Sequence, residues 1–206
     1  MAWFKSQEPK EEGKDWFKKL FEINNIDPVL FLAWFTAICD KKFPKKNTFV
    51  VRGPPDCGKS LIVNTLLENY PSARIGRQGE LTPFYLQNLT QKPIGILEEP
   101  RIIDTFAEDM KLLLGGEPLE VACKNAENEL LKRTPIFITT NRQVGEDCMR
   151  TTREAFKTRF IEFELLKPIG YELERPRVNY SIHNLRGFLD DTMCNLAEEK
   201  IKHLQY

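Results

Sequence analysis

The sequence predicts an α/β domain in which helices flank a central, mostly parallel β-sheet. The first observation is the segment GPPDCGKS at residues 53–60, which fits the phosphate-binding pattern G-x-x-x-x-G-K-S/T. The second is a set of three short, mainly apolar runs at residues 47–52, 94–99 and 135–141, typical of buried strands. Helical patterns stand between these runs, and such alternation favours a parallel sheet.

The phosphate-binding segment has the expected neighbours on both sides. A β-branched and aromatic run precedes it, and residues 60–69 follow with apolar side chains on one helical face. This order directs backbone N–H groups and the positive end of a helix at phosphate oxygens. Gly53 and Gly58 allow unusual backbone angles and a close approach, Lys59 brings a charge to the outer phosphates, and Ser60 offers a hydroxyl to Mg²⁺. We therefore expect a nucleoside triphosphate to bind here, rather than a chance glycine-lysine turn.

The composition of the chain indicates its cellular compartment and the kinds of partner it can bind. The 206 residues suit one α/β domain with appendages or two small domains, and 41% hydrophobic residues suffice for a core. Thirty basic and thirty acidic residues balance, so any nucleic-acid contact has to come from local loops. Five scattered cysteines and two histidines favour free thiols over a zinc site. With no signal peptide and no membrane-spanning run, we expect a soluble, intracellular chain without stable membrane association.

Two helices are predicted before the first strand. Residues 15–21 place four apolar side chains on one helical face, which favours packing on the next helix over binding to a membrane surface. Asp27 and Pro28 are typical of a helix start, and the helix that follows, to about Cys39, is apolar nearly all round and should be buried. The lysines of residues 41–46 then form a basic linker, for which a solvated turn is favoured over a nucleic-acid contact.

The second mainly apolar run ends in two adjacent carboxylates, Glu98 and Glu99. A short strand at residues 73–75 and a short helix at residues 82–89 are expected before it. An acid at the tip of a buried strand can hold Mg²⁺ through water, and its neighbour can orient or deprotonate an attacking water. Downstream of a phosphate-binding loop, this role is favoured over an ordinary acidic strand end.

A helix, a hairpin and a third buried strand follow. Asp104 is expected to cap the helix, and two glycines end it at residues 115–116. The hairpin has arms at residues 119–123 and 129–133, with Lys124 at or near its tip. The third strand ends at Asn141, whose amide could bind both a γ-phosphate oxygen and a water, or could simply form a turn.

The rest of the chain is predicted to form a helix at residues 152–159, a strand at 160–165 and a closing amphipathic helix at 184–203. The segment between the last two, residues 168–180, is expected to be irregular.

The order of these motifs resembles the superfamily 3 helicases of small DNA viruses, and most of all the parvoviral replication initiators. The phosphate-binding segment GPPDCGKS is similar to the corresponding loop of parvoviral, papillomaviral and polyomaviral helicases. The entry KKNT at residues 45–48 resembles parvoviral replication proteins. LKRTPIF at 131–137 and AFKTRF at 155–160 resemble the segments that lead into motif C and that carry the arginine finger in the polyomaviral large antigen. The resemblance covers roughly residues 27 to 165.

This resemblance implies a modified AAA+ ATPase that forms a ring, usually a hexamer, with ATP and Mg²⁺ at the subunit interfaces. Glu98 and Ser60 would hold the metal, Glu99 would activate water, and Lys59 would bind phosphate. Asn141 would sense the γ-phosphate. The implied nucleotide-binding set is Gly53, Pro54, Pro55, Asp56, Cys57, Gly58, Lys59, Ser60 and Leu61.

The resemblance also assigns residues that act beyond their own subunit. Arg159, with Arg133 as a second candidate, would reach into the neighbouring nucleotide site. Lys124 would line the central channel and bind a phosphate of single-stranded DNA. The hairpin tip has one clear lysine where parvoviral relatives often have more, so Lys132 is expected to share in DNA binding.

The expected domain boundaries are a helical segment at residues 1–43, which could be an oligomerisation bundle, an ATPase core at 44–166, and a C-terminal extension at 167–206. Neither a histidine-containing nicking domain nor a zinc-binding tail is found in the sequence, which indicates a motor domain taken from a longer polypeptide. A DNA-virus protein of this kind would act in the host nucleus.

Two other functions stay open at this point. One is a superfamily 3 ATPase of an RNA virus that acts on RNA or membranes, although a cysteine-rich zinc segment is missing here and only a weak amphipathic start is present. The other is a nucleotide-controlled assembly protein that forms rings without unwinding nucleic acid. The paired acids, Asn141 and Arg159 favour hydrolysis over that alternative.

Overall fold

The computed structural model describes residues 14–75, 83–169, 188–189 and 191–204. These residues form two compact units. The loop unit combines described residues of Met1–Ala37, Gly53–Asn69 and Phe163–Tyr206, and the sheet unit combines those of Ile38–Arg52 and Tyr70–Glu162. Each unit is taken by itself below.

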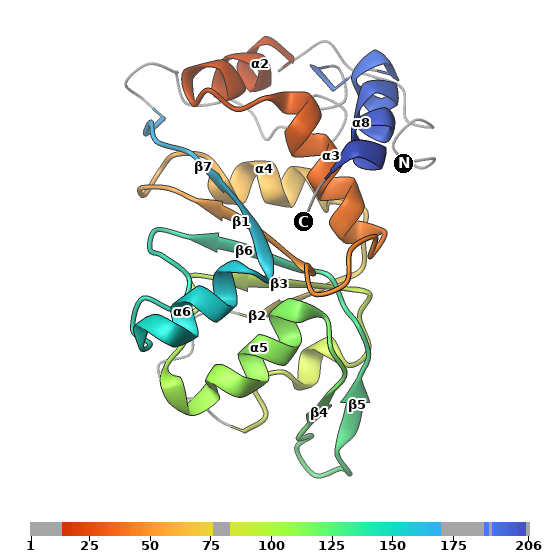
Figure 1. The fold of residues 1–206 in the computed structure, drawn as a ribbon, viewed down its shortest axis with the longest axis vertical. Coiled ribbons are helices and arrows are strands. Elements are labelled where there is room, and N and C mark those ends of the chain that lie inside the picture. Colours follow the sequence, from red (N-terminus) through yellow and green to blue (C-terminus); the bar gives the residue numbers. More distant parts are fainter. Residues whose placement is uncertain (1–13, 76–82, 170–187, 190, 205–206) are drawn as a thin grey trace. The chain divides into compact units, whose positions relative to one another are not determined.

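The sheet unit contains a five-stranded sheet with the strand order β2-β3-β6-β1-β7 (Figure 1). The neighbouring pairs β1 with β6, β3 with β6 and β2 with β3 are parallel, which confirms the predicted sheet. The strand bounds are β1 Thr48–Arg52, β2 Ser72–Ile75, β3 Ile94–Glu98, β6 Ile136–Thr140 and β7 Phe160–Glu164.

The register brings the ends of three strands to one edge of the sheet. Arg52 lies opposite Thr140, and Glu98 lies opposite Thr139. The carboxyl ends of β1, β3 and β6 therefore meet at this edge, which we call the carboxyl edge. In the sequence, Gly53 follows Arg52 directly, so the phosphate-binding loop begins where β1 ends.

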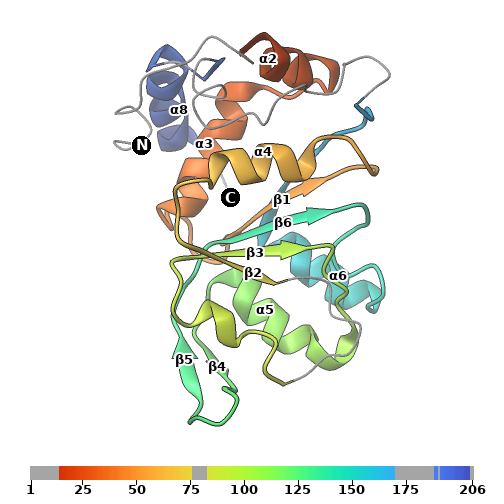
Figure 2. The ribbon, with the colours of Figure 1, turned by 180° about the vertical axis from the view of Figure 1, so that it is seen from behind.

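Two helices cover one face of the sheet, as the two opposite views agree (Figures 1 and 2). They are α5, Ala107–Gly115, and α6, Arg150–Lys157. Met110 and Leu114 of α5 and Phe156 of α6 belong to the same buried apolar cluster as the strand residues Val50 and Ile138. Within the strands, all of β6 is buried, which explains its uninterrupted apolar run.

A β-hairpin extends from the sheet unit beyond the end of α5 (Figure 2). Its strands are β4, Leu119–Val121, and β5, Glu129–Leu131, and they are antiparallel with Leu119 opposite Leu131. Gly116 ends α5 in the left-handed region with φ 74°, and Glu117 N–H donates to Leu112 O at 2.9 Å. The predicted hairpin is confirmed, with shorter arms.

The loop unit is mainly helical, with α2 Lys14–Ile23, α3 Pro28–Cys39, α4 Lys59–Leu66 and α8 Asp191–His203. The predicted apolar face of α2 is buried, and its Phe21 ring lies 5.1 Å from that of Phe31 on α3. The Phe31 ring in turn lies 4.8 Å from that of Phe163. The prediction that α2 packs on the next helix is confirmed.

Three local predictions need correction. A helix was expected at residues 82–89. The described residues there form turns and a short 3-10 helix, η1, Gln87–Leu89. Its hydrogen bonds, such as Leu89 N–H to Leu86 O, span three residues and not the four of an α-helix. Asp104 does not cap its own helix. Its carboxylate accepts the N–H of Met149, the residue before α6, at 3.2 and 3.3 Å.

The closing helix is shorter than expected. It starts at Asp191, and residues 184–187 lie outside the described parts. It buries Cys194 and Ala197, whereas Leu196, expected on the apolar face, is 47% exposed. Most of the segment expected to be irregular, residues 170–180, also lies outside the described parts. Among the described helices, none has the length and hydropathy needed to cross a bilayer.

Candidate functional site

The phosphate-binding loop is held in a shape that only glycine permits at two positions. A Cβ atom on Gly53 would lie 2.2 Å from Leu165 O and 2.8 Å from Cys57 Sγ. Gly58, directly before α4, has φ 93°, in the left-handed region. Ile169 N–H donates to Asp56 O at 2.7 Å, which fixes the loop from outside.

A cavity of about 440 Å³ opens over this loop. It is lined by Asp56, Cys57, Gly58, Lys59, Ser60, Leu61 and Ile169. The Lys59 side chain is buried, and its Nζ donates to Pro54 O at 3.0 Å, across the loop. A buried ammonium is costly unless oxygens surround it, so a phosphate entering the cavity would find a favourable partner. Ser60 is exposed at the first turn of α4.

The same loop contains a fully buried thiol, that of Cys57. Burial raises the pKa of the Cys57 thiol, against the smaller opposing effect of the Lys59 charge. The side chain therefore stays protonated and acts as a packing group beneath the loop.

The carboxyl edge of the sheet unit brings Glu99 and Asn141 together. Glu99 Oε2 accepts the backbone N–H of Asn141 at 3.0 Å, and Glu99 N–H donates to Thr139 O at 2.8 Å. Glu99 has φ 47°, a conformation that costs a residue other than glycine about 1–2 kcal/mol. The chain thus turns sharply after β3 and directs the second acid across the end of β6.

A cavity of about 230 Å³ lies at this edge, with Glu99, Thr140 and Asn141 in its lining. Two ion pairs form part of its wall, Arg101 Nε to Asp147 Oδ2 at 3.1 Å and Arg142 Nη1 to Glu146 Oε1 at 3.0 Å. Polar groups of both charges thus surround the acid and the asparagine that were predicted to act together.

Glu98 has a partner that the sequence did not reveal. Its Oε1 accepts from Arg74 Nη1 of β2 at 2.7 Å. Arg74 was predicted only as part of a short strand. The signal available in the sequence was a single basic residue between apolar positions, and this pattern does not show which acid the residue contacts.

Arg133 and Arg159 lie at the other edge of the sheet, which we call the amino edge. Here the residues at or just before the starts of β1, β6 and β7 hydrogen bond to one another, with Asn47 N–H to Arg159 O at 3.2 Å and Ile136 N–H to Asn47 O at 3.0 Å. At about 3.3 Å per residue, the five residues of β6 separate the two edges by roughly 13–17 Å. The arginines and the acids of one sheet unit are therefore not brought together.

The side chain of Arg133 is bound by the chain that enters β1. Its Nε donates to Asn47 Oδ1 at 3.2 Å, and its Nη2 donates to the carbonyl oxygens of Phe43 and Lys46. Asn47 is fully buried, and its Nδ2 donates to Leu113 O at 3.2 Å and Thr134 O at 2.6 Å. The Asn47 side chain thus connects the start of β1 to the end of α5 and to the residues just before β6.

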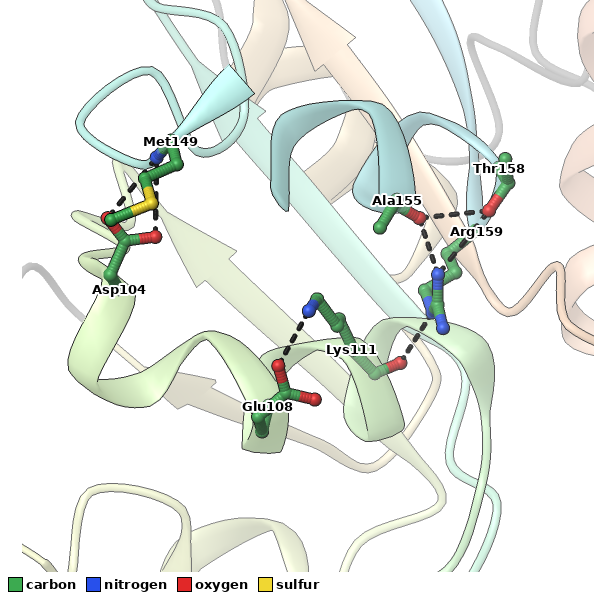
Figure 3. A network of polar contacts seen from close by, with 7 residues as sticks. All are labelled: Asp104, Glu108, Lys111, Met149, Ala155, Thr158 and Arg159. Atoms are coloured by element: carbon green, nitrogen blue, oxygen red, sulfur yellow. Dashed lines mark hydrogen bonds and ion pairs between the residues drawn. The ribbon is translucent and has the colours of Figure 1, made fainter. Parts of the chain in front are cut away.

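Arg159 is bound in a similar way between two helices (Figure 3). Its Nε donates to Lys111 O of α5 at 3.0 Å, and its Nη1 donates to Ala155 O near the end of α6. A positive charge beside carbonyl oxygens in the last turn of a helix is favourable. The same figure shows Asp104 at the start of α6, so α6 has an anion at its amino end and a cation at its carboxyl end.

The two lysines proposed for DNA contact are both exposed near the hairpin, Lys124 in its loop and Lys132 just beyond β5. The Lys124 backbone N–H donates to Gln87 Oε1 of η1 at 3.1 Å, which restrains the loop. Exposed acids, among them Glu120 and Glu129, lie on the same hairpin.

The lysines of the basic linker at residues 41–46 are not all solvated. Lys41, Lys42 and Lys45 are exposed, whereas Lys46 is half-buried and its Nζ donates to Thr158 O at 3.4 Å. Burial lowers the pKa of Lys46.

The two side chains predicted as metal ligands, Ser60 of the loop unit and Glu98 of the sheet unit, both offer oxygen atoms. Among the described residues, no group of three or more histidine, cysteine, aspartate or glutamate side chains is placed to hold a metal. Mg²⁺ binds through one or two hard oxygen ligands together with phosphate oxygens and waters, and the Ser60 hydroxyl and the Glu98 carboxylate are ligands of that type.

The chain is similar to viral replication proteins over most of its length. Residues 4–174 match the family profile described as "Parvovirus non-structural protein NS1". "Initiator protein NS1" of Aedes densonucleosis virus (strain GKV 002 002) is 31% identical over 170 residues, which cover 82% of this chain and 20% of that protein. "Replication protein E1" of Human papillomavirus 57 is 34% identical over 145 residues, 67% of this chain and 22% of that protein. The chain thus spans about a fifth of the length of these relatives.

Solved structures agree on the fold. The NrS-1 C-terminal region in its apo A form superimposes with a TM-score of 0.61 at 18% identity, over 95% of this chain and 53% of that chain. JCV Helicase with a bound small molecule gives a TM-score of 0.57 at 15% identity, over 94% of this chain and 60% of that chain. The chain therefore shares its fold with the NrS-1 C-terminal region and with JCV Helicase. Together with the profile match, this shows that the chain belongs to the parvovirus non-structural protein NS1 family.

Proposed function

We propose that this chain is the ATP-driven DNA helicase motor of a viral replication initiator. The observation that carries the proposal is the phosphate-binding loop, where Gly58 and the buried Lys59 line a cavity at the start of α4 and close contacts leave no room for a side chain at Gly53. Such a cavity suits the phosphates of ATP, because backbone N–H groups and a lysine face the same space. An initiator of this kind would act in the nucleus of the host cell.

The proposed reaction is hydrolysis of the γ-phosphate. The oxygen of a water forms a bond to the γ-phosphorus while the bond from that phosphorus to the β–γ bridging oxygen breaks, giving ADP and inorganic phosphate. Glu99 accepts the proton that the water loses and passes it to solvent. Its sharp turn and its bond to Asn141 support this role, because both restrain the carboxylate. Bound Mg²⁺ would neutralise phosphate charge, with Ser60 and Glu98 as its protein ligands.

We further propose that the site is completed by a second copy of the chain. Arg159 and Arg133 lie at the amino edge, one strand length from the acids of their own sheet unit. A guanidinium in that position is suited to stabilise the charge on a neighbouring copy's γ-phosphate rather than its own, an effect of about 10³–10⁵ in rate in related chemistry. This favours a ring, expected to be a hexamer, with single-stranded DNA in its channel and Lys124 and Lys132 contacting phosphates.

The test is the ATPase rate per subunit, measured against protein concentration with and without single-stranded DNA. A rate that rises with concentration, and further with DNA, supports shared sites in a DNA motor. A measurable rate that ignores both variables contradicts the ring and the helicase function. If no rate is found, sedimentation of the same samples decides whether the ring has failed to assemble or the assembled protein is not an ATPase.

Lys59→Ala is the matched loss-of-function variant. It should reduce hydrolysis to background, since the loop loses its phosphate-binding charge while α4 keeps a good helix former. Lys19→Ala, an exposed change in α2, is its control. Normal turnover in Lys59→Ala would remove the loop from the mechanism.

The membrane-binding alternative loses its main support. The apolar face of α2, residues Trp16, Phe17, Leu20 and Phe21, is buried within the loop unit and is not presented to solvent.

A further inference from the structure

A short segment after β7 lies against the phosphate-binding loop. It consists of residues 165–169, which we call the strap, and both the strap and the loop belong to the loop unit. The strap passes so close to the loop that a Cβ atom on Gly53 would overlap Leu165 O. Ile169 N–H donates to Asp56 O at 2.7 Å, and the Ile169 side chain lines the cavity over the loop. The strap is therefore part of the wall of the candidate nucleotide site.

The side chain of Asn24 joins this strap to α2. Asn24 follows α2 directly and is only 4% exposed. Its Oδ1 accepts the backbone N–H groups of Leu166 at 2.7 Å and Lys167 at 3.1 Å. Its Nδ2 donates to Leu20 O, in the last turn of α2, at 2.8 Å. Buried hydrogen bonds are expensive to leave unmade, so the amide of Asn24 fixes the position of the strap.

Asp56 is the point at which the strap restrains the loop. Its φ of 63° lies in the left-handed region, which is unfavourable for a residue other than glycine. Such a conformation persists only where the surrounding structure holds it. The hydrogen bond from Ile169 N–H is a restraint of this kind, and it acts directly beside Cys57 and Gly58 of the cavity wall.

We propose that Asn24 positions the phosphate-binding loop through the strap and thereby sets the affinity of the chain for nucleotide. The cavity is lined by residues of the loop, by the start of α4 and by Ile169, so Asn24 acts on the nucleotide only through the strap. When the strap is held, a larger fraction of chains has the loop in its binding form, and the apparent affinity rises with that fraction. The inference rests on the proposed nucleotide binding and adds a positioning residue to it.

The first test is the affinity of Asn24 variants for a fluorescent ATP analogue. Asn24→Ala removes all three hydrogen bonds, and its affinity should fall roughly fivefold, as the loss of one restraining hydrogen bond of ordinary strength would produce. Asn24→Asp keeps an oxygen for the two N–H groups of the strap and loses the donor to Leu20 O. Asn24→Asp should therefore be less stable than the wild type and yet keep most of its nucleotide affinity.

A control variant separates positioning from a general loss of stability. Ala197→Gly weakens the interior of α8, in the same unit, because glycine is a poor helix former. Measured well below its melting temperature, Ala197→Gly should bind the analogue like the wild type. An affinity loss in Ala197→Gly equal to that in Asn24→Ala would overturn the proposal. So would an Asn24→Asp chain that binds as weakly as Asn24→Ala, because its strap bonds are kept.

The second test needs no variant and follows from the reciprocity of coupling. If the strap favours nucleotide binding, bound nucleotide must favour the held strap to the same extent. Hydrogen exchange of the backbone amides of Leu166, Lys167 and Ile169 should therefore slow when the ATP analogue is added to the wild-type chain. In Asn24→Ala without nucleotide, the Ile169 amide should exchange faster than in the wild type. Exchange that is unaffected by nucleotide at all three amides would overturn the link.

The outcomes separate this inference from the proposed function. A folded wild-type chain that does not bind the analogue contradicts both. A wild-type chain that binds it, with Asn24→Ala binding equally well, contradicts only the positioning role of Asn24. If Asn24→Ala does not fold, the exchange measurement on the wild type and the affinity of Asn24→Asp still decide the question.

Discussion

The two edges of the sheet hold their charged side chains in different ways. At the carboxyl edge, Glu98 is 42% exposed and bound by one arginine, and Glu99 is restrained in a costly backbone conformation. At the amino edge, Arg133 and Arg159 each donate to backbone carbonyls, and the fully buried Asn47 connects three segments. One edge leaves its ionised groups open to ligands, while the other uses them to join elements.

This difference divides the sheet unit into an edge joined by many hydrogen bonds and an edge whose charged groups are open to solvent. Buried hydrogen bonds, such as those from Asn47 Nδ2 to Leu113 O and Thr134 O, are expensive to leave unmade, so the amino edge is a fixed scaffold. Exposed ion pairs and a strained turn are easily rearranged, so the carboxyl edge can respond to a ligand. Arg159 is the residue that tests this division, because the proposed function requires it to act from the scaffold edge on another subunit.

The largest effect is expected for Arg159→Ala. Hydrolysis should fall by about 10³-fold or more with nucleotide binding nearly intact, because the charge that stabilises the γ-phosphoryl group is lost. Steady-state ATPase and the affinity for a fluorescent ATP analogue measure the two quantities. Arg159 also joins α5 and α6, so the melting temperature of the variant protein should fall. Assays well below that temperature separate the loss of catalysis from the loss of stability.

A mixing experiment makes this prediction specific for action between subunits. Rings mixed from Arg159→Ala and Lys59→Ala chains should recover part of the activity, since some interfaces combine an intact loop with an intact arginine. Both parent proteins alone should be inactive. Wild-type turnover in a ring made wholly of Arg159→Ala chains would assign Arg159 to the scaffold only.

The next effect is expected at the carboxyl edge. Glu99→Gln should reduce hydrolysis by about 10²–10⁴-fold, because an amide cannot take the proton from water. The amide oxygen can still accept the N–H of Asn141, so thermal stability should change little. Glu146→Gln, a change in an exposed pair of the same cavity wall, provides the comparison for stability. A normal hydrolysis rate in Glu99→Gln would show that a group other than Glu99 accepts the proton from water.

The elements that carry the site were predictable because their physics is local. Gly53, Gly58 and Lys59 stand at fixed spacing, and a strand must precede them for the loop to form. The strand that leads to Glu98 and Glu99 was predictable from its apolar run. The register of a sheet is not local, so neither the pairing of Glu98 with Arg74 nor the left-handed turn at Glu99 could be predicted from spacing.

The contacts of the amino edge were harder to predict, because they also join residues far apart in the sequence. Asn47 was expected only as the first residue of a strand, yet it is a buried connector between segments 66 and 87 residues away in sequence. Asp104 was expected to cap the helix that follows it, and it instead accepts from Met149, 45 residues away. A capping residue shows that a helix start is near, and it does not show which helix.

Asn47→Ala measures the strength of the scaffold. The free energy of unfolding should fall by about 2–4 kcal/mol, because two carbonyls and a guanidinium lose a buried partner. Urea unfolding followed by circular dichroism measures this change. Asn128→Ala, which removes an exposed bond to Glu120, should cost far less. Equal losses in both variants would remove the distinction between a fixed and an open edge.

The smallest effect is expected at the start of α6. Asp104→Ala should lower the free energy of unfolding by about 1 kcal/mol, the usual cost of losing an acceptor at a helix start. Asp104→Asn keeps an acceptor oxygen and removes the charge, so it separates the hydrogen bond to Met149 from attraction to the helix dipole. If Asp104→Asn is as stable as the wild type, the hydrogen bond accounts for the effect. If it loses as much as Asp104→Ala, the charge does, and the stability of α6 then depends on opposite charges at its two ends, Asp104 and Arg159.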